Sequence, residues 1–377
     1  MRYLHKYIQK DLQKKMVFIG GPRQCGKTTL AKRILKQATS VDEYNYFNWD
    51  DDQDRQNILK RKFHPDSRLI VLDEIHKYSR WKNWLKGLYD TQKNSHNFLV
   101  TGSARLDVYR RGGDSMMGRY HYWRLHPFTL SEIPKGIGKK ETYKRLLSVG
   151  GFPEPFLDNN EREARRWRRE RQDKILKDDV RDLEAVTQIT TMGLLLDKLK
   201  TRVGGMVVFS NLAEELFVSP KTIRHWIEIL EKMYVLFCVW PYSKNMARAI
   251  RKPPKIYFYD NADVEGDEGV RFENLVANHL LKKNQFMEDY EGYRYELRYV
   301  RDKEGHEVDF VILKDGKVDE LIEAKLSDGV VSPSLAYFAN RLKPTKAYQL
   351  VGEASKLGFE GNLRSLDAVE ELSRPFY

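Results

Sequence analysis

The residues with the clearest chemistry lie near the N-terminus, where residues 21–28 fit the phosphate-binding pattern G-x-x-x-x-G-K-S/T without a mismatch. In such a loop, backbone N–H groups surround phosphates at the N-terminus of a helix, where the helix dipole favours anions. Lys27 would reach the β- and γ-phosphates of a nucleotide, and the hydroxyl of Thr28 would bind Mg²⁺. We therefore predict ATP and Mg²⁺ as cofactors, held by Gly21, Pro22, Arg23, Gln24, Cys25, Gly26, Lys27, Thr28, Thr29 and Asp73.

Two carboxylates follow the apolar run 69–72 and are the next candidate groups, Asp73 and Glu74. A continuous apolar run is typical of a strand buried on both faces of a parallel sheet. Charges at the carboxyl end of such a strand face a ligand crevice. Asp73 would hold the Mg²⁺ through water, and Glu74 would polarise the attacking water in ATP hydrolysis. The alternative is that the two carboxylates only end a strand.

Small hydroxyl groups follow a third expected strand, residues 97–101. Ser103 is the candidate for sensing the γ-phosphate, with Thr101 as the alternate, although Thr-Gly-Ser is also common in turns. Arg119 is a candidate cation for the γ-phosphate, in its own subunit or in a neighbouring one, because its charge is permanent and its donors form a fixed fork. A surface arginine without this role is the competing interpretation.

The elements that would position these groups can also be predicted. The apolar run 16–19 before the loop predicts a strand, and the apolar spacing of residues 29–35 predicts a helix. The loop therefore has the strand–loop–helix context that its motif requires. Residues 134–140 are rich in glycine and lysine and predict a linker or surface loop after this core.

A strongly basic helix is predicted at residues 161–171, where arginines surround Trp167. It is either a surface that faces nucleic acid or a solvated helix whose arginines pair with Glu161, Glu163 and Glu170.

Two shorter helices are predicted at residues 211–216 and 220–230. Ser219 would be the N-cap of the second helix, and Pro220 would occupy its first position. The apolar stripe of the second helix, Ile223, Trp226, Ile227 and Leu230, leaves Lys221, Arg224 and His225 facing outward. This pattern is typical of a helix-turn-helix recognition helix followed by a wing. The alternative is the same fold used only for packing or oligomer contacts.

A third group of candidate residues lies near the C-terminus. Residues 307–313 and 321–325 predict two strands of a hairpin whose turn is 314–317. The hairpin would bring together Asp309, Glu323 and Lys325, and this spacing resembles the PD-(D/E)XK nuclease signature. Glu273 on the preceding helix matches the upstream acidic residue of that fold.

This C-terminal arrangement would suit phosphodiester hydrolysis. Asp309 and Glu323 would bind Mg²⁺, which lowers the pKa of bound water, and the ammonium of Lys325 would orient the water or stabilise the anion. Whether cleavage is retained stays open, because such folds can lose cleavage and keep DNA binding. The Pro-Asp form of the motif is also absent, since Val308 precedes Asp309.

Several motifs together resemble the prokaryotic AAA-type ATPases that carry a C-terminal DUF4143 domain. The resemblance rests on the loop, Leu72-Asp73-Glu74, Thr101-Gly102-Ser103, residues 113–119, His126-Pro127-Phe128 and residues 150–154. It implies a relation to origin-recognition and archaeal ATPases and an α/β multidomain fold: a P-loop core with a parallel sheet, a helical lid, a winged helix-turn-helix and often a restriction-endonuclease-like α/β domain. The expected boundaries are 1–135 for the core, 136–205 for the lid and basic linker, 206–255 for the winged helix and 256–377 for the nuclease-like domain.

Composition favours a globular chain of several domains with a polyanionic partner. The chain has 377 residues, 41% of them hydrophobic, and its 66 Lys and Arg exceed its 54 Asp and Glu, giving a net charge of +12. Such an excess makes nucleic acid, and DNA in particular, the expected partner. The two cysteines, Cys25 and Cys238, favour a reducing cytoplasm and no structural disulfide. The sequence shows neither a secretion signal nor an apolar run of about 20 residues that could span a membrane. We therefore expect no association with a membrane.

The leading hypothesis is a Mg²⁺-dependent ATPase that binds DNA and couples ATP hydrolysis to a nuclease-like C-terminal domain. One alternative is a nucleotide-gated DNA-binding switch whose nuclease-like domain is inactive. Another is an ATPase that remodels a protein partner. A homo-oligomer with Arg119 acting on a neighbour and a monomeric switch fit the residues equally well.

Overall fold

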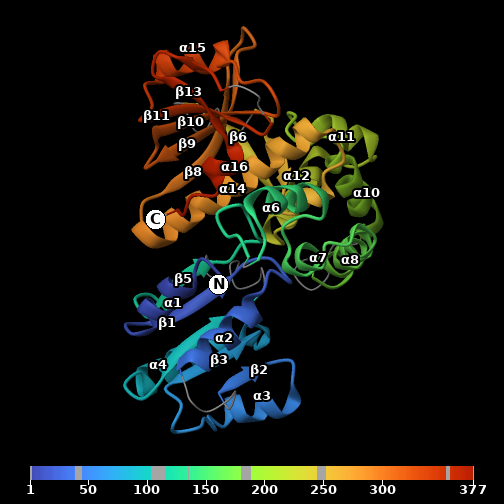
Figure 1. Ribbon diagram of the computed structural model, residues 1–377. Helices are drawn as coiled ribbons and strands as arrows, with labels where there is room; N and C mark the ends of the chain where they lie inside the picture. The colour runs from blue at the N-terminus through green and yellow to red at the C-terminus, as the bar shows by residue number, and fades with distance from the viewer. Residues whose placement is uncertain are drawn as a thin grey trace. The chain divides into compact units, whose positions relative to one another are not determined.

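The computed structural model describes residues 2–38, 45–102, 116–134, 136–179, 188–243, 252–353 and 357–376. The chain forms two compact units, Met1–Pro127 and Phe128–Tyr377 (Figure 1). In the described residues, no helix combines the length and the apolar character needed to cross a membrane.

The first unit is built on a five-stranded parallel sheet with the strand order β2-β3-β4-β1-β5. β1 and β3 are buried at every position, as expected for strands covered on both faces. The strands are β1 (Met16–Gly20), β2 (Tyr46–Asn48), β3 (Leu69–Asp73), β4 (Asn97–Thr101) and β5 (Tyr120–Arg124). The helices are α1 (His5–Leu12), α2 (Lys27–Ala38), α3 (Asp52–Leu59), the 3₁₀ turn η1 (Ile75–Lys77) and α4 (Trp81–Gln92). The predicted strands at 16–19, 69–73 and 97–101 and the helix after the loop are confirmed.

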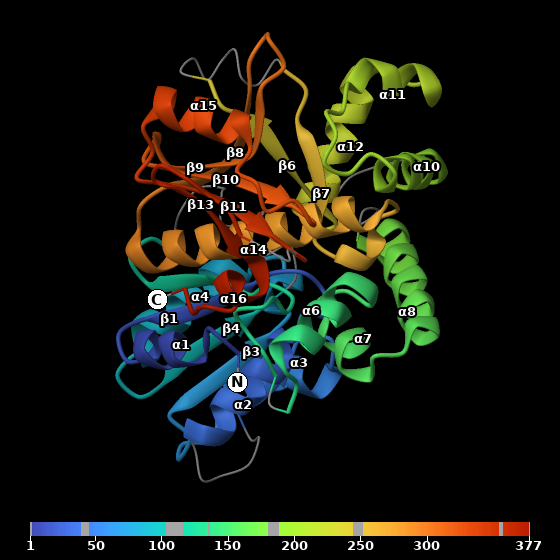
Figure 2. The same cartoon turned by 45° about the horizontal axis from the view of Figure 1, so that its top comes forward.

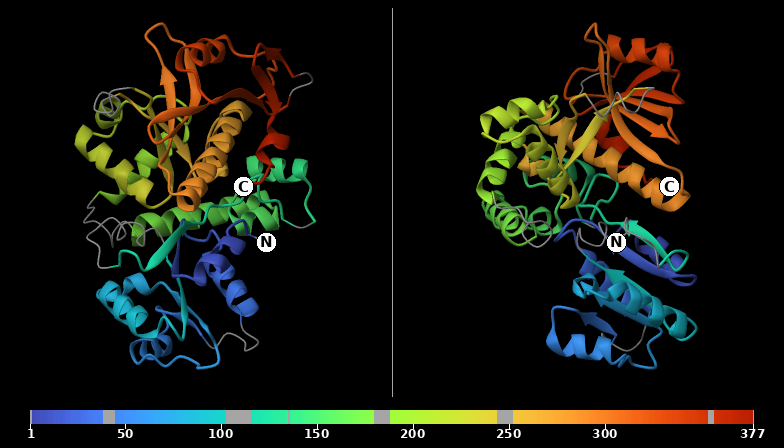
Figure 3. Two further views of the ribbon diagram at one scale, coloured as in Figure 1. Left: turned by 90° about the vertical axis from the view of Figure 1, so that its left-hand side faces the viewer. Right: turned by 180° about the vertical axis from the view of Figure 1, so that it is seen from behind.

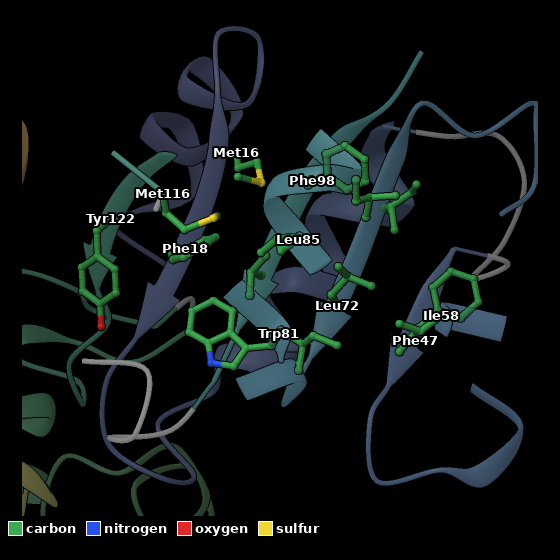
Figure 4. Close-up of a cluster of buried hydrophobic side chains, with 14 residues drawn as sticks. Met16, Phe18, Phe47, Ile58, Leu72, Trp81, Leu85, Phe98, Met116 and Tyr122 are labelled. Atoms are coloured by element: carbon green, nitrogen blue, oxygen red, sulfur yellow. The ribbon is translucent and has the colours of Figure 1, made fainter. Parts of the chain in front are cut away.

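One face of this sheet forms an apolar core with α4. Phe18 of β1 and Leu72 of β3 belong to it because alternate residues of a strand share a face. Trp81 and Leu85 of α4 lie between them (Figure 4). This packing fixes β1 and β3, whose carboxyl ends carry the candidate nucleotide residues.

The second unit begins with helices. These are α6 (Lys139–Ser148), α7 (Pro153–Asp158), α8 (Glu161–Lys174), the π-helical turn η2 (Ile175–Asp179), α10 (Ile189–Lys200), α11 (Phe209–Glu215) and α12 (Pro220–Lys232). On α8, Trp167 is buried, while Arg165 pairs with Glu161 and Arg166 with Glu163. These ion pairs favour the solvated, salt-bridged interpretation of the basic helix over a surface reserved for nucleic acid.

A mixed eight-stranded sheet completes the second unit, with the order β12-β13-β11-β10-β9-β8-β6-β7. Its strands are β6 (Leu236–Pro241), β7 (Lys255–Phe258), β8 (Tyr295–Arg301), β9 (Glu307–Lys314), β10 (Lys317–Lys325), β11 (Lys346–Val351), β12 (Phe359–Glu360) and β13 (Leu363–Asp367). Its helices are the 3₁₀ turn η3 (Asn261–Asp263), α14 (Glu268–Glu291), α15 (Pro333–Leu342) and α16 (Ala368–Leu372).

Two helices cover this sheet. α14 packs on β7, β8 and β10, and α15 packs on β9, β10 and β11. Figure 2 shows the two helices on opposite sides of the sheet, and the long α14 is also visible in both views of Figure 3. The predicted hairpin is confirmed: β9 and β10 are antiparallel and joined through Asp315 and Gly316, both with positive φ, as a tight hairpin turn requires.

Candidate functional site

The phosphate-binding loop connects β1 to α2, and its glycines are required by the backbone. Gly21 has φ +137°, and a Cβ at this position would lie 2.2 Å from the carbonyl oxygen of Leu125. Gly26 also has a positive φ of 92°. Only glycine adopts such conformations without strain. The loop is therefore closed against the segment that follows β5.

Further contacts hold the loop in place. The guanidinium of Arg2 donates to the carbonyl oxygens of Cys25, at 2.7 Å, and His126. Cys25 is buried, and its thiol donates to the carbonyl oxygen of Leu125 at 3.4 Å. The side chains of Gln24 and Thr29 are exposed. Arg2 was not a sequence prediction, and no motif marks it.

Lys27 and Thr28 begin α2 and point to two different sets of partners. The ammonium of Lys27 is buried and donates to the carbonyl oxygens of Gly21, at 3.1 Å, and Pro22, at 2.6 Å. The hydroxyl of Thr28 donates to Oδ2 of Asp73 at 2.7 Å. The structure thus brings the two predicted Mg²⁺ ligands together, although 45 residues separate them.

Asp73 is the centre of a hydroxyl network at the carboxyl edge of the parallel sheet. Besides Thr28, the hydroxyl of Tyr46 donates to its Oδ2 at 2.8 Å, and the hydroxyl of Thr101 donates to its Oδ1. Burial, and then the charge of Asp73, raises the pKa of Tyr46 well above its ordinary value. Tyr46 was missed by sequence analysis. Its strand β2 is only three residues long and carries no motif.

Glu74 lies directly beside this network in a left-handed conformation, with φ 57° and ψ 18°. Its backbone N–H donates to the carbonyl oxygen of Thr101 at 3.0 Å. Burial raises the pKa of its carboxyl group, and the charges of Lys27 and Lys77 partly offset this rise. A carboxylate with a raised pKa is better suited to accept a proton from water than an exposed one.

Hydroxyl and carboxylate oxygens of this kind are the ligands that Mg²⁺ prefers. Thr28 and Asp73 therefore fit the metal that accompanies a bound nucleotide.

The two remaining predicted residues of this site do not join it. Ser103 lies outside the described residues. Arg119 pairs with Asp90, with Nε 2.8 Å from Oδ1, and its carbonyl oxygen accepts from the N–H of Met16. Met16 begins β1 and Gly20 ends it, so at about 3.3 Å per residue the loop lies about 13 Å away along the strand. The structure therefore does not bring Arg119 to the loop of its own unit, because Arg119 lies beside the start of β1 and the loop follows the end of that strand.

In the second unit, the predicted C-terminal residues converge around a lysine. The ammonium of Lys255 lies 2.6 Å from Oε1 of Glu307, 3.1 Å from Oδ1 of Asp309 and 3.5 Å from Oε1 of Glu273. We call Glu273, Glu307 and Asp309 the acidic cluster. Burial lowers the pKa of Lys255, but Asp309, Glu273 and Glu307 raise it more, so the net shift is upward and the ammonium stays charged.

Glu323 and Lys325 lie beside the acidic cluster on β10. Oδ2 of Asp309 accepts from the N–H of Ala324 at 3.1 Å, and Nζ of Lys325 lies 2.9 Å from Oε1 of Glu323. Oε2 of the buried Glu323 has no hydrogen-bond partner among the described residues. Burial, and then the charge of Asp309, raises the pKa of both Glu323 and Glu273 to about 7.

The acidic cluster does not offer the open set of oxygens that a divalent cation needs, because Lys255 occupies one oxygen of each carboxylate. Within the described ranges, no group of three or more His, Cys, Asp or Glu is arranged to hold a metal ion. Sequence analysis missed Lys255, Glu307 and Tyr257, whose hydroxyl donates to Glu273 at 2.6 Å. Glu307 could have been found, since it lies two residues before Asp309 on the same strand face.

The predicted recognition helix, α12, has the expected cap and faces. The hydroxyl oxygen of Ser219 accepts from the N–H of Thr222 at 3.0 Å, and Pro220 is its first residue. Its predicted apolar stripe is buried, and its basic face, Lys221, Arg224 and His225, is exposed. Phe217, in the turn before α12, is 96% exposed. The antiparallel pair β6–β7 follows α12 and is continuous with the large sheet through β8.

Three family descriptions match consecutive parts of the chain. They are an AAA domain over residues 13–134, a domain of unknown function (DUF8612) over 140–262 and a domain of unknown function (DUF4143) over 268–368. The glycine-rich loop and the Asp73 network both lie within the first of these ranges.

Curated relatives include the uncharacterized protein Rv2008c of Mycobacterium tuberculosis, 26% identical over 65% of this chain and 54% of that protein. Another is the uncharacterized protein MJ1637 of Methanocaldococcus jannaschii, 27% identical over 67% of this chain and 62% of that protein. The chain spans about half the length of the mycobacterial relative.

Solved structures with some similarity include the Thermotoga maritima RuvB Holliday junction branch migration motor, with 18% identity and a TM-score of 0.30, over 62% of this chain and 88% of that one. The Aeropyrum pernix ORC1 protein in complex with DNA matches with 13% identity and a TM-score of 0.35, over 74% of this chain and 91% of that one. By these matches, the chain is similar to AAA domains over residues 13–134, which include the phosphate-binding loop, and to DUF4143 domains over residues 268–368, with the DUF8612 match between them.

Proposed function

We propose that this protein is a Mg²⁺-dependent ATPase that binds DNA and changes its DNA interaction with nucleotide state. The observation that supports ATP hydrolysis best is the hydroxyl network around Asp73, which joins Thr28 of the loop to the carboxylate that ends β3. Thr28 and Asp73 would hold the Mg²⁺ of the nucleotide, which, when bound, neutralises charge on the phosphates. Glu74 would accept the proton of the attacking water.

The other residues of the site have narrower roles. The ammonium of Lys27, now on the carbonyl oxygens of Gly21 and Pro22, would pair with the phosphates instead. We retain Ser103 as the proposed γ-phosphate sensor. Arg119 could act only on the nucleotide of a neighbouring subunit, because within its own unit it lies at the far edge of the sheet.

Phosphate release from ATP tests this proposal. Lys27→Ala should abolish most Mg²⁺-dependent hydrolysis, since the loop loses its cation. Lys36→Ala is the matched control, because Lys36 is an exposed lysine on the same helix. Equal hydrolysis by the wild-type protein and Lys27→Ala would refute an ATPase site in this loop.

DNA binding is proposed from the exposed basic face of α12 and the net charge of +12. We propose that α11, α12 and the β6–β7 pair act as a winged helix-turn-helix, after a helical lid formed by residues 136–205. Lys221→Ala combined with Arg224→Ala should weaken DNA binding. The slope of the logarithm of the binding constant against the logarithm of salt concentration should become shallower by about one unit for each lost phosphate contact.

Arg165→Ala combined with Arg166→Ala is the control, because these exposed arginines lie on α8 and pair with glutamates. Fluorescence anisotropy with labelled duplex DNA at several salt concentrations measures both variants. An absence of DNA affinity even at low salt would favour the third hypothesis, an ATPase that remodels a protein partner.

For the C-terminal domain we propose a nuclease-like α/β fold, supported by the convergence of Glu273 and Asp309 with the neighbouring Glu323 and Lys325. Lys255 within the acidic cluster favours a binding platform over cleavage in this conformation. Cleavage remains the second candidate function because Glu323 keeps an unused buried oxygen. Incubation of end-labelled single-stranded, duplex and branched DNA with Mg²⁺ or Mn²⁺ tests it, and cleavage lost in Asp309→Ala would establish a nuclease.

A further inference from the structure

Lys255 is unusually placed for a lysine. It begins β7, its side chain is 3% exposed, and its ammonium lies within 3.5 Å of three carboxylates. An ammonium has three hydrogen-bond donors, so one lysine can satisfy one oxygen of each member of the acidic cluster. A buried carboxylate without a countercharge is strongly unfavourable, and this lysine supplies the countercharge.

The segment 204–207, which leads into α11, closes the cluster on one side. The N–H of Gly204 donates to the carbonyl oxygen of Ile256 at 3.2 Å, and Met206 pairs with Lys255 as an antiparallel bridge. A Cβ on Gly204 would lie 3.0 Å from a carboxylate oxygen of Glu273. The backbone of this segment therefore lies directly against the acidic cluster and is paired with the strand that carries Lys255.

One oxygen beside the cluster is unused. Oε2 of Glu323 is buried without a hydrogen-bond partner among the described residues, and Glu323 is only 4% exposed. The neighbouring Ala324 is hydrogen-bonded to Asp309. A buried carboxylate oxygen is costly to leave unpaired, so this oxygen would gain a partner from a bound cation or water.

We propose that the ammonium of Lys255 is the resident counter-cation of the acidic cluster and excludes a divalent cation from Glu273, Asp309 and Glu323. Mg²⁺ and Mn²⁺ require several oxygen ligands at once, and Lys255 already takes one oxygen from Glu273 and one from Asp309, two of the three carboxylates that would supply them. A metal can enter only when Lys255 leaves. Because the backbone of Lys255 is bridged to Met206, loading of the cluster is linked to the position of the segment 204–207, which leads into α11.

This inference rests on the proposed nuclease-like character of the C-terminal domain, and its test does not depend on cleavage. Binding of Mn²⁺ to the full chain without nucleotide is measured by electron paramagnetic resonance of the free ion. Lys255→Met should gain one Mn²⁺ site relative to the wild-type protein, and Lys255→Met with Asp309→Asn should lose it again. Lys283→Met is the control, since Lys283 pairs with Glu320 outside the cluster.

If Lys255→Met does not fold, Lys255→Met with Glu307→Gln removes one charge of each sign and keeps Glu273, Asp309 and Glu323. Circular dichroism reports folding of each variant. A folded variant without Lys255 that binds no more Mn²⁺ than the wild-type protein would overturn the proposal. So would a wild-type protein with an Mn²⁺ site that Asp309→Asn removes. ATP hydrolysis measured in parallel reports the proposed ATPase separately, because Lys255 lies outside that site.

Discussion

The hydroxyl of Thr28 and Oδ2 of Asp73 are joined by a 2.7 Å hydrogen bond, which links the first residues of α2 to the last residue of β3. The strand order places β4 between β1 and β3, and all three strands are parallel. Their carboxyl ends therefore meet at one edge of the sheet, where open α/β sheets bind ligands. Two motifs that are distant in the sequence form one site for this reason.

Tyr46→Phe should weaken the affinity of the ATPase site for Mg²⁺. The change removes the hydroxyl that donates to Asp73 and keeps the ring, which contacts the ammonium of Lys32 at 4.3 Å. Groups that hold a metal ligand in place typically contribute about 10-fold or more to metal affinity. We expect the Mg²⁺ concentration for half-maximal hydrolysis to rise by about that factor.

A titration of hydrolysis rate against Mg²⁺ measures this effect, with Tyr89→Phe on α4 as the control. Identical Mg²⁺ curves for Tyr46→Phe and the wild-type protein would show that Tyr46 has no part in positioning Asp73.

Much of this site could be predicted because its signals are local. The loop, the apolar run before Asp73 and the β9–β10 hairpin are short segments. In each of them, the residue types of the segment itself are enough to predict its local structure. Tyr46 and Lys255 could not be found in this way, since their partners Asp73 and Asp309 lie 27 and 54 residues away. The position of Arg119 could not be predicted either, because sequence does not give the register of β5 on β1, which puts Arg119 beside the start of β1.

A second prediction concerns the buried ion pair of Lys282 and Glu132. Nζ of Lys282 lies 2.8 Å from Oε2 of Glu132, and the two side chains are 0% and 4% exposed. Lys282→Met removes the positive charge that lies beside a buried carboxylate, so the free energy of unfolding should fall by about 3–5 kcal/mol. Adding Glu132→Leu should restore most of that loss, because two apolar side chains can replace a buried pair.

Urea unfolding followed by tryptophan fluorescence measures both variants. Lys139→Met is the control, because Lys139 pairs with Glu370 on the surface and exposed pairs contribute little. If Lys282→Met alone is as stable as the wild-type protein, the Lys282–Glu132 pair has no structural role.

A third prediction is a pH dependence that comes from Glu323. Burial raises the pKa of this carboxyl group to about 7 in the folded protein, above the value of 4.5 expected when it is exposed. Between these values the folded chain binds more protons than the unfolded chain, so stability falls as pH rises and becomes constant above about 7. The slope for one such group is at most about 1.4 kcal/mol per pH unit.

Glu323→Gln should remove this contribution, so its unfolding free energy should decline less than that of the wild-type protein between about pH 5 and about pH 8. Urea unfolding at both pH values gives the comparison, with the exposed Glu360→Gln as the control. Equal pH dependence in Glu323→Gln and the wild-type protein would mean that Glu323 is ionised throughout this range.

The most direct test of the ATPase assignment is the behaviour of Glu74→Gln. The substitution keeps the loop and Asp73 but removes the carboxylate proposed to accept the proton from water. We predict that ATP binding, followed with a fluorescent analogue, is retained while the hydrolysis rate falls by about 100-fold or more. Asp50→Asn is the control, since Asp50 also contacts Lys77 but lies outside the site. Hydrolysis by Glu74→Gln at the wild-type rate would contradict the assignment of the catalytic carboxylate to Glu74.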